Sequence, residues 1–139
     1  MSLELCDVYF EVDLILMPTV LIVHASVDDR AMYADYLRAH AYDVVECERT
    51  DEALTQASEA DVTITGLMVP GSFDGVELIR RLRGADATRN RPVIVLTACV
   101  TKEHEEAARQ AGCDAFLGKP CLPDVLLAKV REVLSVKSF

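Results

Sequence analysis

DVTITGLMVPGSFDG, residues 61–75, is the stretch of the chain from which the fold can be inferred. Residues 62–66 predict a short buried strand, a Pro-Gly loop follows, and the Asp-Gly step at the end predicts the start of a helix. In an open parallel α/β sheet, reactive groups lie at the carboxyl ends of the strands, which is where Gly66 stands. Glycine offers neither a nucleophile nor a ligand, so the first question is whether this position belongs to a site that lacks its reactive residue.

The strand-then-helix order of this stretch repeats along the chain. Strands are predicted at residues 20–23, 43–47, 62–66, 93–96 and 115–118, each followed by a helical pattern. Continuous apolar strands that alternate with helices are typical of a parallel sheet with helices on both faces. Because the crossovers are right-handed, we predict a doubly wound, five-stranded α/β sheet of order 2-1-3-4-5.

Polar residues at the helix starts predict where the helices begin. A side-chain oxygen at the N-cap accepts a hydrogen bond from an otherwise unpaired backbone N–H group. The expected capping residues are Asp28 or Asp29, Thr50, Asp74 and Thr101.

Length and composition favour one globular domain. The chain has 139 residues, of which 51% are hydrophobic and 27% charged, as in globular proteins and unlike disordered ones. Its net charge of -9 argues against nucleic acid and against anionic membrane surfaces as partners. No apolar run approaches the roughly 20 residues of a membrane span.

The cysteines favour a reduced compartment. Their number is odd, and their spacing matches no zinc site; they are Cys6, Cys47, Cys99, Cys113 and Cys121. Scattered cysteines of this kind are typical of small buried side chains in the cytoplasm.

Residues 1–17 precede the regular pattern and form an N-terminal extension to a domain at 18–139. The extension alternates apolar and polar residues, which predicts a strand. Three interpretations stay open: an extra edge strand, an arm exchanged between the protomers of a homodimer, or sequence upstream of a natural start at Met17.

Four segments together resemble the receiver domain of two-component response regulators, which has the CheY-like, flavodoxin-like fold. They are VLIV at 20–23, LMVPGSFDGVEL at 67–78, PVIVLTA at 92–98 and AGCDAFLGKP at 111–120. The resemblance implies a non-enzymatic module of phosphorelay signal transduction. It also implies a protein partner, either a histidine kinase or a downstream regulator.

The resemblance assigns the family's acidic positions to residues that are not acidic. Gly66, four residues before Pro70, matches the phosphoacceptor aspartate, while His24 and Ala25 match the acidic pair that holds magnesium. We therefore expect no Mg²⁺ site and no phosphorylation at the usual position, as in a degenerate or pseudo-receiver.

Other family positions keep their usual residues. Thr97 and Lys119 match the residues that bind phosphoryl oxygens, Pro120 matches a proline that follows a cis peptide bond, and Phe116 matches the switch aromatic. The family's output surface, made by its fourth helix, fifth strand and fifth helix, is the expected contact surface of this chain.

Several alternatives remain open. Asp28 or Asp29 could serve as an unorthodox phosphoacceptor, or the chain could be a flavodoxin-type domain that binds a small molecule. Lys119 has three expected roles: reaching water, pairing with one of these aspartates, or holding an anion with Thr97. His24 is a pH-sensitive group, a metal ligand or, more simply, a hydrogen-bonded pocket residue.

Overall fold

The computed structural model describes residues 17–137. Of the N-terminal extension, only Met17 falls within these residues, so the strand or arm expected there lies outside them. The strands are β1 (Thr19–Val23), β2 (Asp43–Cys47), β3 (Val62–Thr65), β4 (Val93–Thr97) and β5 (Ala115–Gly118). The helices are α2 (Val27–Ala39), α3 (Thr50–Gln56), the 3₁₀ turn η1 (Ala57–Glu59), α4 (Gly75–Gly84), α5 (Lys102–Ala111) and α6 (Pro123–Lys137).

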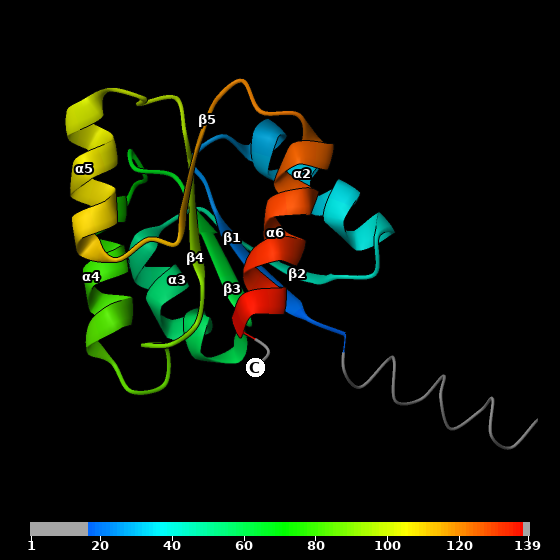
Figure 1. The fold of residues 1–139 in the computed structure, drawn as a ribbon, viewed down its shortest axis with the longest axis horizontal. Helices are drawn as coiled ribbons and strands as arrows, with labels where there is room; N and C mark the ends of the chain where they lie inside the picture. The colour runs from blue at the N-terminus through cyan, green and yellow to red at the C-terminus, as the bar shows by residue number, and fades with distance from the viewer. Residues whose placement is uncertain (1–16, 138–139) are drawn as a thin grey trace, which may run out of the picture.

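The strands form one parallel sheet of order β2-β1-β3-β4-β5, which confirms the predicted doubly wound topology. Helices α2 and α6 cover one face of the sheet, and α3, α4 and α5 cover the other (Figure 1). Since all strands run in the same direction, their carboxyl ends lie along one edge of the sheet, where a crevice forms.

Strand β1 shows why the sequence favours a sheet that is covered by helices on both faces. Its residues Val20 to Val23 are fully buried, as expected for a central strand covered on both faces. Val20 and Ile22 pack in the core beneath α2 and α6, whereas Leu21 and Val23 pack in the core beneath α3 and α4. The period-2 alternation of a strand thus divides one apolar run between two cores.

Two of the expected helix caps are wrong. The cap of α2 is Ser26, whose hydroxyl accepts a hydrogen bond from the N–H group of Asp29 at 3.2 Å; Asp28 and Asp29 instead lie in the first turn, where acids favour the positive end of the helix. Thr50 is the first residue of α3, and its hydroxyl donates to the carbonyl oxygen of Phe73 at 2.6 Å. The Thr50 hydroxyl therefore bonds to a distant part of the chain and does not cap α3.

The other two caps are confirmed. Asp74 accepts from the N–H group of Glu77 at the start of α4, and Thr101 accepts from the N–H group of His104 at the start of α5. None of the helices in residues 17–137 has the length and apolar character needed to cross a membrane.

The loop between β3 and α4 is fastened to the start of α3. The N–H group of Thr50 donates to the carbonyl oxygen of Pro70 at 2.9 Å, beside the bond from Thr50 to Phe73. Gly71 has a φ of +138°, and a Cβ atom there would lie 2.2 Å from the Thr50 hydroxyl. Glycine is therefore required at this turn, and the loop holds a defined path past the crevice.

Candidate functional site

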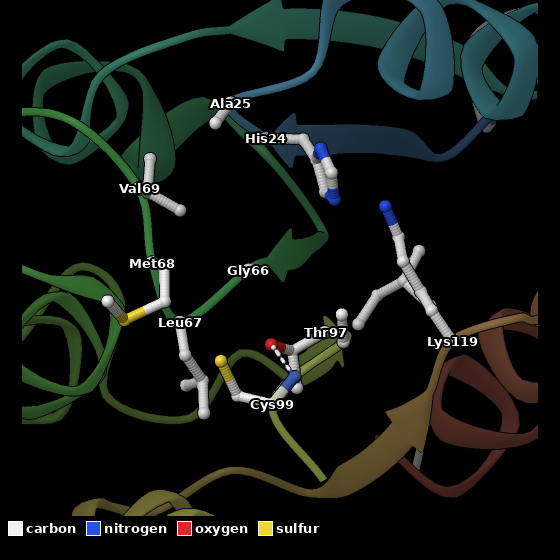
Figure 2. Close-up of a pocket in the computed structure, with 11 residues that line it drawn as sticks. His24, Ala25, Gly66, Leu67, Met68, Val69, Thr97, Cys99 and Lys119 are labelled. Carbon is white, nitrogen blue, oxygen red and sulfur yellow. Dashed lines mark hydrogen bonds between the residues drawn. The ribbon is translucent and has the colours of Figure 1, made fainter.

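A pocket of about 240 Å³ lies at the carboxyl edge of the sheet. It is formed where β1, β3, β4 and β5 end (Figure 2). Its lining residues are His24, Ala25, Gly66, Leu67, Met68, Val69, Leu96, Thr97, Ala98, Cys99 and Lys119. The sequence-based site residues at the ends of these four strands are thus brought together, with the exceptions of Phe116 and Pro120.

Gly66 lies directly after β3 and is held by the backbone. Its N–H group donates to the carbonyl oxygen of Val23 at 3.0 Å. A Cβ atom at this position would lie 3.3 Å from the nearest Val69 methyl group and 3.7 Å from His24 Cδ2. Within the described chain, the glycines with positive φ are Gly71 and Gly112, so the backbone at position 66 does not demand a glycine. A Cβ atom there would require the Val69 side chain to move by a few tenths of an ångström.

His24 directly follows β1 and turns its ring toward Lys119 (Figure 2). Its backbone N–H group donates to the carbonyl oxygen of Cys47 at 3.1 Å, and its ring Nδ1 accepts from the N–H group of Ser26 at 3.2 Å. Burial lowers the pKa of His24, and the Lys119 charge lowers it further, while Asp29 opposes the shift. The ring is therefore held as a neutral imidazole, with Nδ1 as the acceptor.

Lys119 pairs with one of the two candidate aspartates. Its ammonium donates to Asp29 Oδ2 at 2.5 Å, with side-chain exposures of 16% for Lys119 and 45% for Asp29. This hydrogen bond is the main cause of a lowered pKa at Asp29. Asp28, by contrast, is exposed, so the structure selects Asp29 from the pairings that the sequence left open.

Thr97 ends β4 and is almost fully buried, at 4% exposure. Its hydroxyl oxygen accepts from the N–H group of Cys99 at 3.0 Å. Thr97 and Lys119, the residues expected to bind an anion, both line the pocket. Each already has a partner from the chain. The Thr97 hydroxyl is bonded to the Cys99 N–H group, and the Lys119 ammonium is paired with Asp29.

The two remaining family positions lie beside the pocket. Phe116 on β5 is half-buried and packs against the core beneath α3, α4 and α5. The peptide bond between Lys119 and Pro120 is cis, as the resemblance implied.

The apolar character of the pocket was not predicted from the sequence. Leu67 and Val69 are buried beside Gly66, and Met68 between them is 71% exposed. Figure 2 shows these three residues on the side of the pocket opposite His24 and Lys119. The available signal was the Leu-Met-Val run that directly follows Gly66.

The comparisons with known proteins agree on one family. A family model described as the response regulator receiver domain matches residues 20–131. The phosphate regulon transcriptional regulatory protein PhoB of Pseudomonas aeruginosa is 32% identical over 118 residues, which cover 84% of this chain and 51% of PhoB. The chain therefore spans about half the length of that relative.

Two further matches are covered almost completely. The polar-differentiation response regulator DivK of Brucella anthropi is 32% identical over 123 residues, which cover 87% of this chain and 94% of DivK. The structure of the chemotaxis response regulator CheY4 of Vibrio cholerae has a TM-score of 0.78 and 28% identity, with coverage of 84% of this chain and 98% of CheY4.

Proposed function

The chain belongs to the response regulator receiver domain family, and from this premise we propose that it signals by binding a protein partner, without phosphorylation at position 66. Residues 18–139 form the signalling module in this proposal, with 1–17 as an extension. The module is not an enzyme: it works through a surface that a partner recognises.

One observation carries this proposal. At the ends of β1 and β3, where the family has three carboxylates, the chain has His24, Ala25 and Gly66. The carboxylate that reaches the pocket cation is Asp29, and it forms an ion pair with Lys119. A glycine cannot accept a phosphoryl group, because it has no side-chain oxygen.

The donor atoms of the pocket do not suit Mg²⁺. Magnesium requires hard oxygen ligands in nearly octahedral geometry. The pocket lining offers an imidazole, a thiol, an ammonium, one hydroxyl and otherwise apolar side chains. Within residues 17–137, no group of three or more His, Cys, Asp or Glu side chains is placed to hold a metal ion. We therefore propose that the module works without a bound Mg²⁺.

The proposed contact surface consists of α5, β5 and α6, which correspond to the output surface of the family. Receiver domains interact with histidine kinases or downstream regulators, and we propose a partner of one of these two kinds. On this surface Val125 is 46% exposed, and α5 carries the ion pair between Arg109 and Glu105. An apolar side chain among charged ones suits a reversible protein contact.

Phosphorylation can be tested directly. The full chain is incubated with acetyl phosphate and Mg²⁺, and intact mass and ¹H–¹⁵N spectra are recorded. We expect neither a mass gain nor a spectral shift, while CheY4 as positive control is expected to react.

A mass gain that maps to Asp29 or Asp28 would overturn the proposal and establish the unorthodox phosphoreceiver. Asp29→Asn and Asp28→Asn variants would then identify the acceptor. A spectral shift at Thr97 and Lys119 without a mass gain, produced equally by inorganic phosphate, would instead support the anion-binding alternative.

A further inference from the structure

Arginines gather on α4 and on the loop between α4 and β4. Residues 80–91 contain five arginines and one acid, whereas the whole chain has 14 basic and 23 acidic residues. Four of these arginines form what we call the arginine cluster: Arg80, Arg81, Arg89 and Arg91. The side chains of the first three are 58%, 48% and 54% exposed. An acidic chain thus carries a concentrated basic surface.

The fifth arginine, Arg83, fixes the loop that carries two members of the cluster. Its guanidinium donates to the carbonyl oxygens of Arg89 at 2.9 Å and Arg91 at 2.6 Å. It also donates twice to the carbonyl oxygen of Gly112 and once to the Asp114 carboxylate. These bonds use all the N–H donors of a guanidinium group. Arg83 therefore positions the cluster and has no donor left for another partner.

The cluster has more positive charge than the neighbouring acids neutralise. Arg80 and Arg81 share a single carboxylate, that of Glu77. Arg89 pairs with Asp86, whose side chain is 94% exposed. Exposed ion pairs of this kind are individually weak and can exchange partners. The surface is therefore able to accept further carboxylates.

The chain enters β1 beside the fourth member of the cluster. Arg91 donates to the carbonyl oxygen of Ala60. The next residue, Asp61, exchanges two hydrogen bonds of 2.8 Å with Thr19, because its N–H group donates to the Thr19 carbonyl oxygen and its carboxylate accepts from the Thr19 N–H group. The start of β1 and the end of α4 lie at the same edge of the molecule (Figure 1). Residues 1–16 therefore lead into the fold next to Arg91.

This N-terminal segment has the chemistry that arginine binds. Residues 1–16 contain no lysine or arginine but four acids, namely Glu4, Asp7, Glu11 and Asp13. Arginine pairs with carboxylates through two parallel N–H bonds and stacks on aromatic rings, and Tyr9 and Phe10 lie among these acids. Arg81 already stacks on the ring of Phe73, with Cζ 4.0 Å from the ring centre. The arginine stems also offer apolar surface to the apolar residues of the segment.

We propose that residues 4–16 dock on the arginine cluster of the same chain. Asp13 and Glu11 are nearest to β1 and face Arg91 and Arg89, while the earlier acids reach the arginines of α4. An extended chain covers roughly 3.3–3.6 Å per residue, so the segment is long enough for this path. The inference goes beyond the proposed function, because the cluster lies outside α5, β5 and α6 and its occupant belongs to the chain itself.

Tethering favours this occupant over a separate acidic partner. A segment joined to the fold by a short connection has an effective concentration in the millimolar range, so several weak ion pairs can act together. Nucleic acid is a poorer candidate, because the chain outside the cluster is acidic and repels a phosphate backbone. The proposed pairs are exposed, so they should weaken as salt is added.

The test is an NMR study of the ¹³C,¹⁵N-labelled full chain at low ionic strength. We expect nuclear Overhauser contacts between the rings of Tyr9 and Phe10 and the arginine side chains of residues 80–91. These contacts should fade when salt is raised to about 1 M, at which the Debye length falls to about 3 Å.

Two double variants locate the docking. Arg80→Gln with Arg89→Gln removes two exposed arginines of the cluster, and we expect the ratio of docked to undocked segment to fall by about threefold or more. Lys102→Gln with Arg109→Gln is the matched control. It removes two exposed charges on α5 that are also paired with acids, and it should leave the ratio unchanged.

A synthetic peptide with the sequence of residues 1–16 distinguishes the occupants. In the unaltered chain the cluster is occupied, so the peptide should bind weakly. A variant with all four acids of the segment changed to amides leaves the cluster free: Glu4→Gln, Asp7→Asn, Glu11→Gln and Asp13→Asn. The peptide should bind this variant at least about tenfold more tightly, with shifts at residues 85–91.

Three results would overturn the proposal. The first is an absence of contacts between residues 4–16 and the cluster in the unaltered chain; peptide binding would then mark the cluster as a site for a separate acidic partner. The second is a set of contacts that persists unchanged in the double variant of Arg80 and Arg89. The third is a set of contacts between differently labelled chains in a mixed sample, which would indicate an arm exchanged within a homodimer.

Discussion

The Lys119 ammonium contacts one ionisable group and faces another, and it lowers the pKa of both. Its hydrogen bond stabilises the Asp29 carboxylate, and its charge disfavours protonation of the His24 ring, which burial already disfavours. At neutral pH the pocket therefore holds one ion pair beside a neutral imidazole. These three side chains replace the charge arrangement that carboxylates at positions 24, 25 and 66 would create.

The pKa of His24 reports this arrangement. In Lys119→Gln the cation is removed and Asp29 is freed, and both changes favour a charged imidazole. We expect the His24 pKa to rise relative to the unaltered chain, as measured by NMR titration of its ring protons. Lys129→Gln, which removes a lysine paired with Glu132 on α6, is the matched control. Equal His24 pKa values in the two variants would contradict the proposed coupling.

The lowered His24 pKa also sets the sign of a pH effect on stability. The folded state releases the His24 proton more readily than the unfolded state, whose ordinary pKa is 6.5. The contribution of this group is thus complete above pH 6.5 and is lost as the pH falls toward the folded-state value. Asp29 follows the same sign at lower pH, below its ordinary value of 3.8.

At this scale the sequence identified the residues but not their pairing. The motif around Lys119 placed it at the pocket, and both Asp28 and Asp29 were possible partners. The choice depends on the phase of α2, which begins at Val27 because Ser26 is its cap. A shift of one residue turns a helical side chain by about 100°, so the pairing could not be read from spacing alone.

Among the elements, helix α2 matters most for the pocket, because the residue at which it begins determines where Asp29 lies. Ser26→Ala removes the hydroxyl that accepts from the Asp29 N–H group. We expect a loss of about 1 kcal/mol in the free energy of unfolding, measured by urea denaturation. Ser58→Ala changes an exposed serine of η1 and should have little effect.

A companion variant separates the observed cap from the one expected from the sequence. Asp28→Asn removes a first-turn charge but no capping bond, so it should cost less than Ser26→Ala. A larger loss for Asp28→Asn would mean that α2 begins later than Val27.

The other helix starts show which caps a sequence can reveal. Asp74 and Thr101 bond to N–H groups three residues ahead of them, so the relevant atoms lie within one local stretch. Thr50 bonds to Phe73, 23 residues away. That partner is created by the fold of the loop after β3, and a local capping rule cannot anticipate it.

At the scale of the whole molecule, the alternation of apolar strands and helices predicted a doubly wound sheet, of which the order 2-1-3-4-5 is one arrangement. The rule that crossovers are right-handed leaves few ways to connect five such units. The shape and polarity of the pocket could not be predicted in the same way. They depend on how four loops converge, and on the fact that Leu67 and Val69 turn inward while Met68 remains exposed.

The scaffold should accept a rebuilt acidic site. His24→Asp, Ala25→Asp and Gly66→Asp are combined in one chain. A Cβ atom at position 66 would lie 3.3 Å from a Val69 methyl group, so that side chain must move by a few tenths of an ångström. We expect this triple variant to gain Mg²⁺ binding, because three carboxylates would then converge on the pocket. Titration calorimetry with MgCl₂ measures the gain.

The matched control carries asparagine at the same three positions, with the same side-chain shape but no added charge. It should not bind Mg²⁺ in the same concentration range. A triple aspartate variant that folds, as judged by its ¹H–¹⁵N spectrum, yet binds no better than the control would show that the pocket is not a receiver site lacking only its acids.

Gly66 also affects how long a signal can last. A carboxylate at the end of β3 could carry a covalent mark whose lifetime would set how long a signal lasts. Glycine can carry no such mark on a side chain, so position 66 cannot serve as a timer. In the proposed function, the duration of a signal is then set by how long the partner stays bound and by how much of the protein is present.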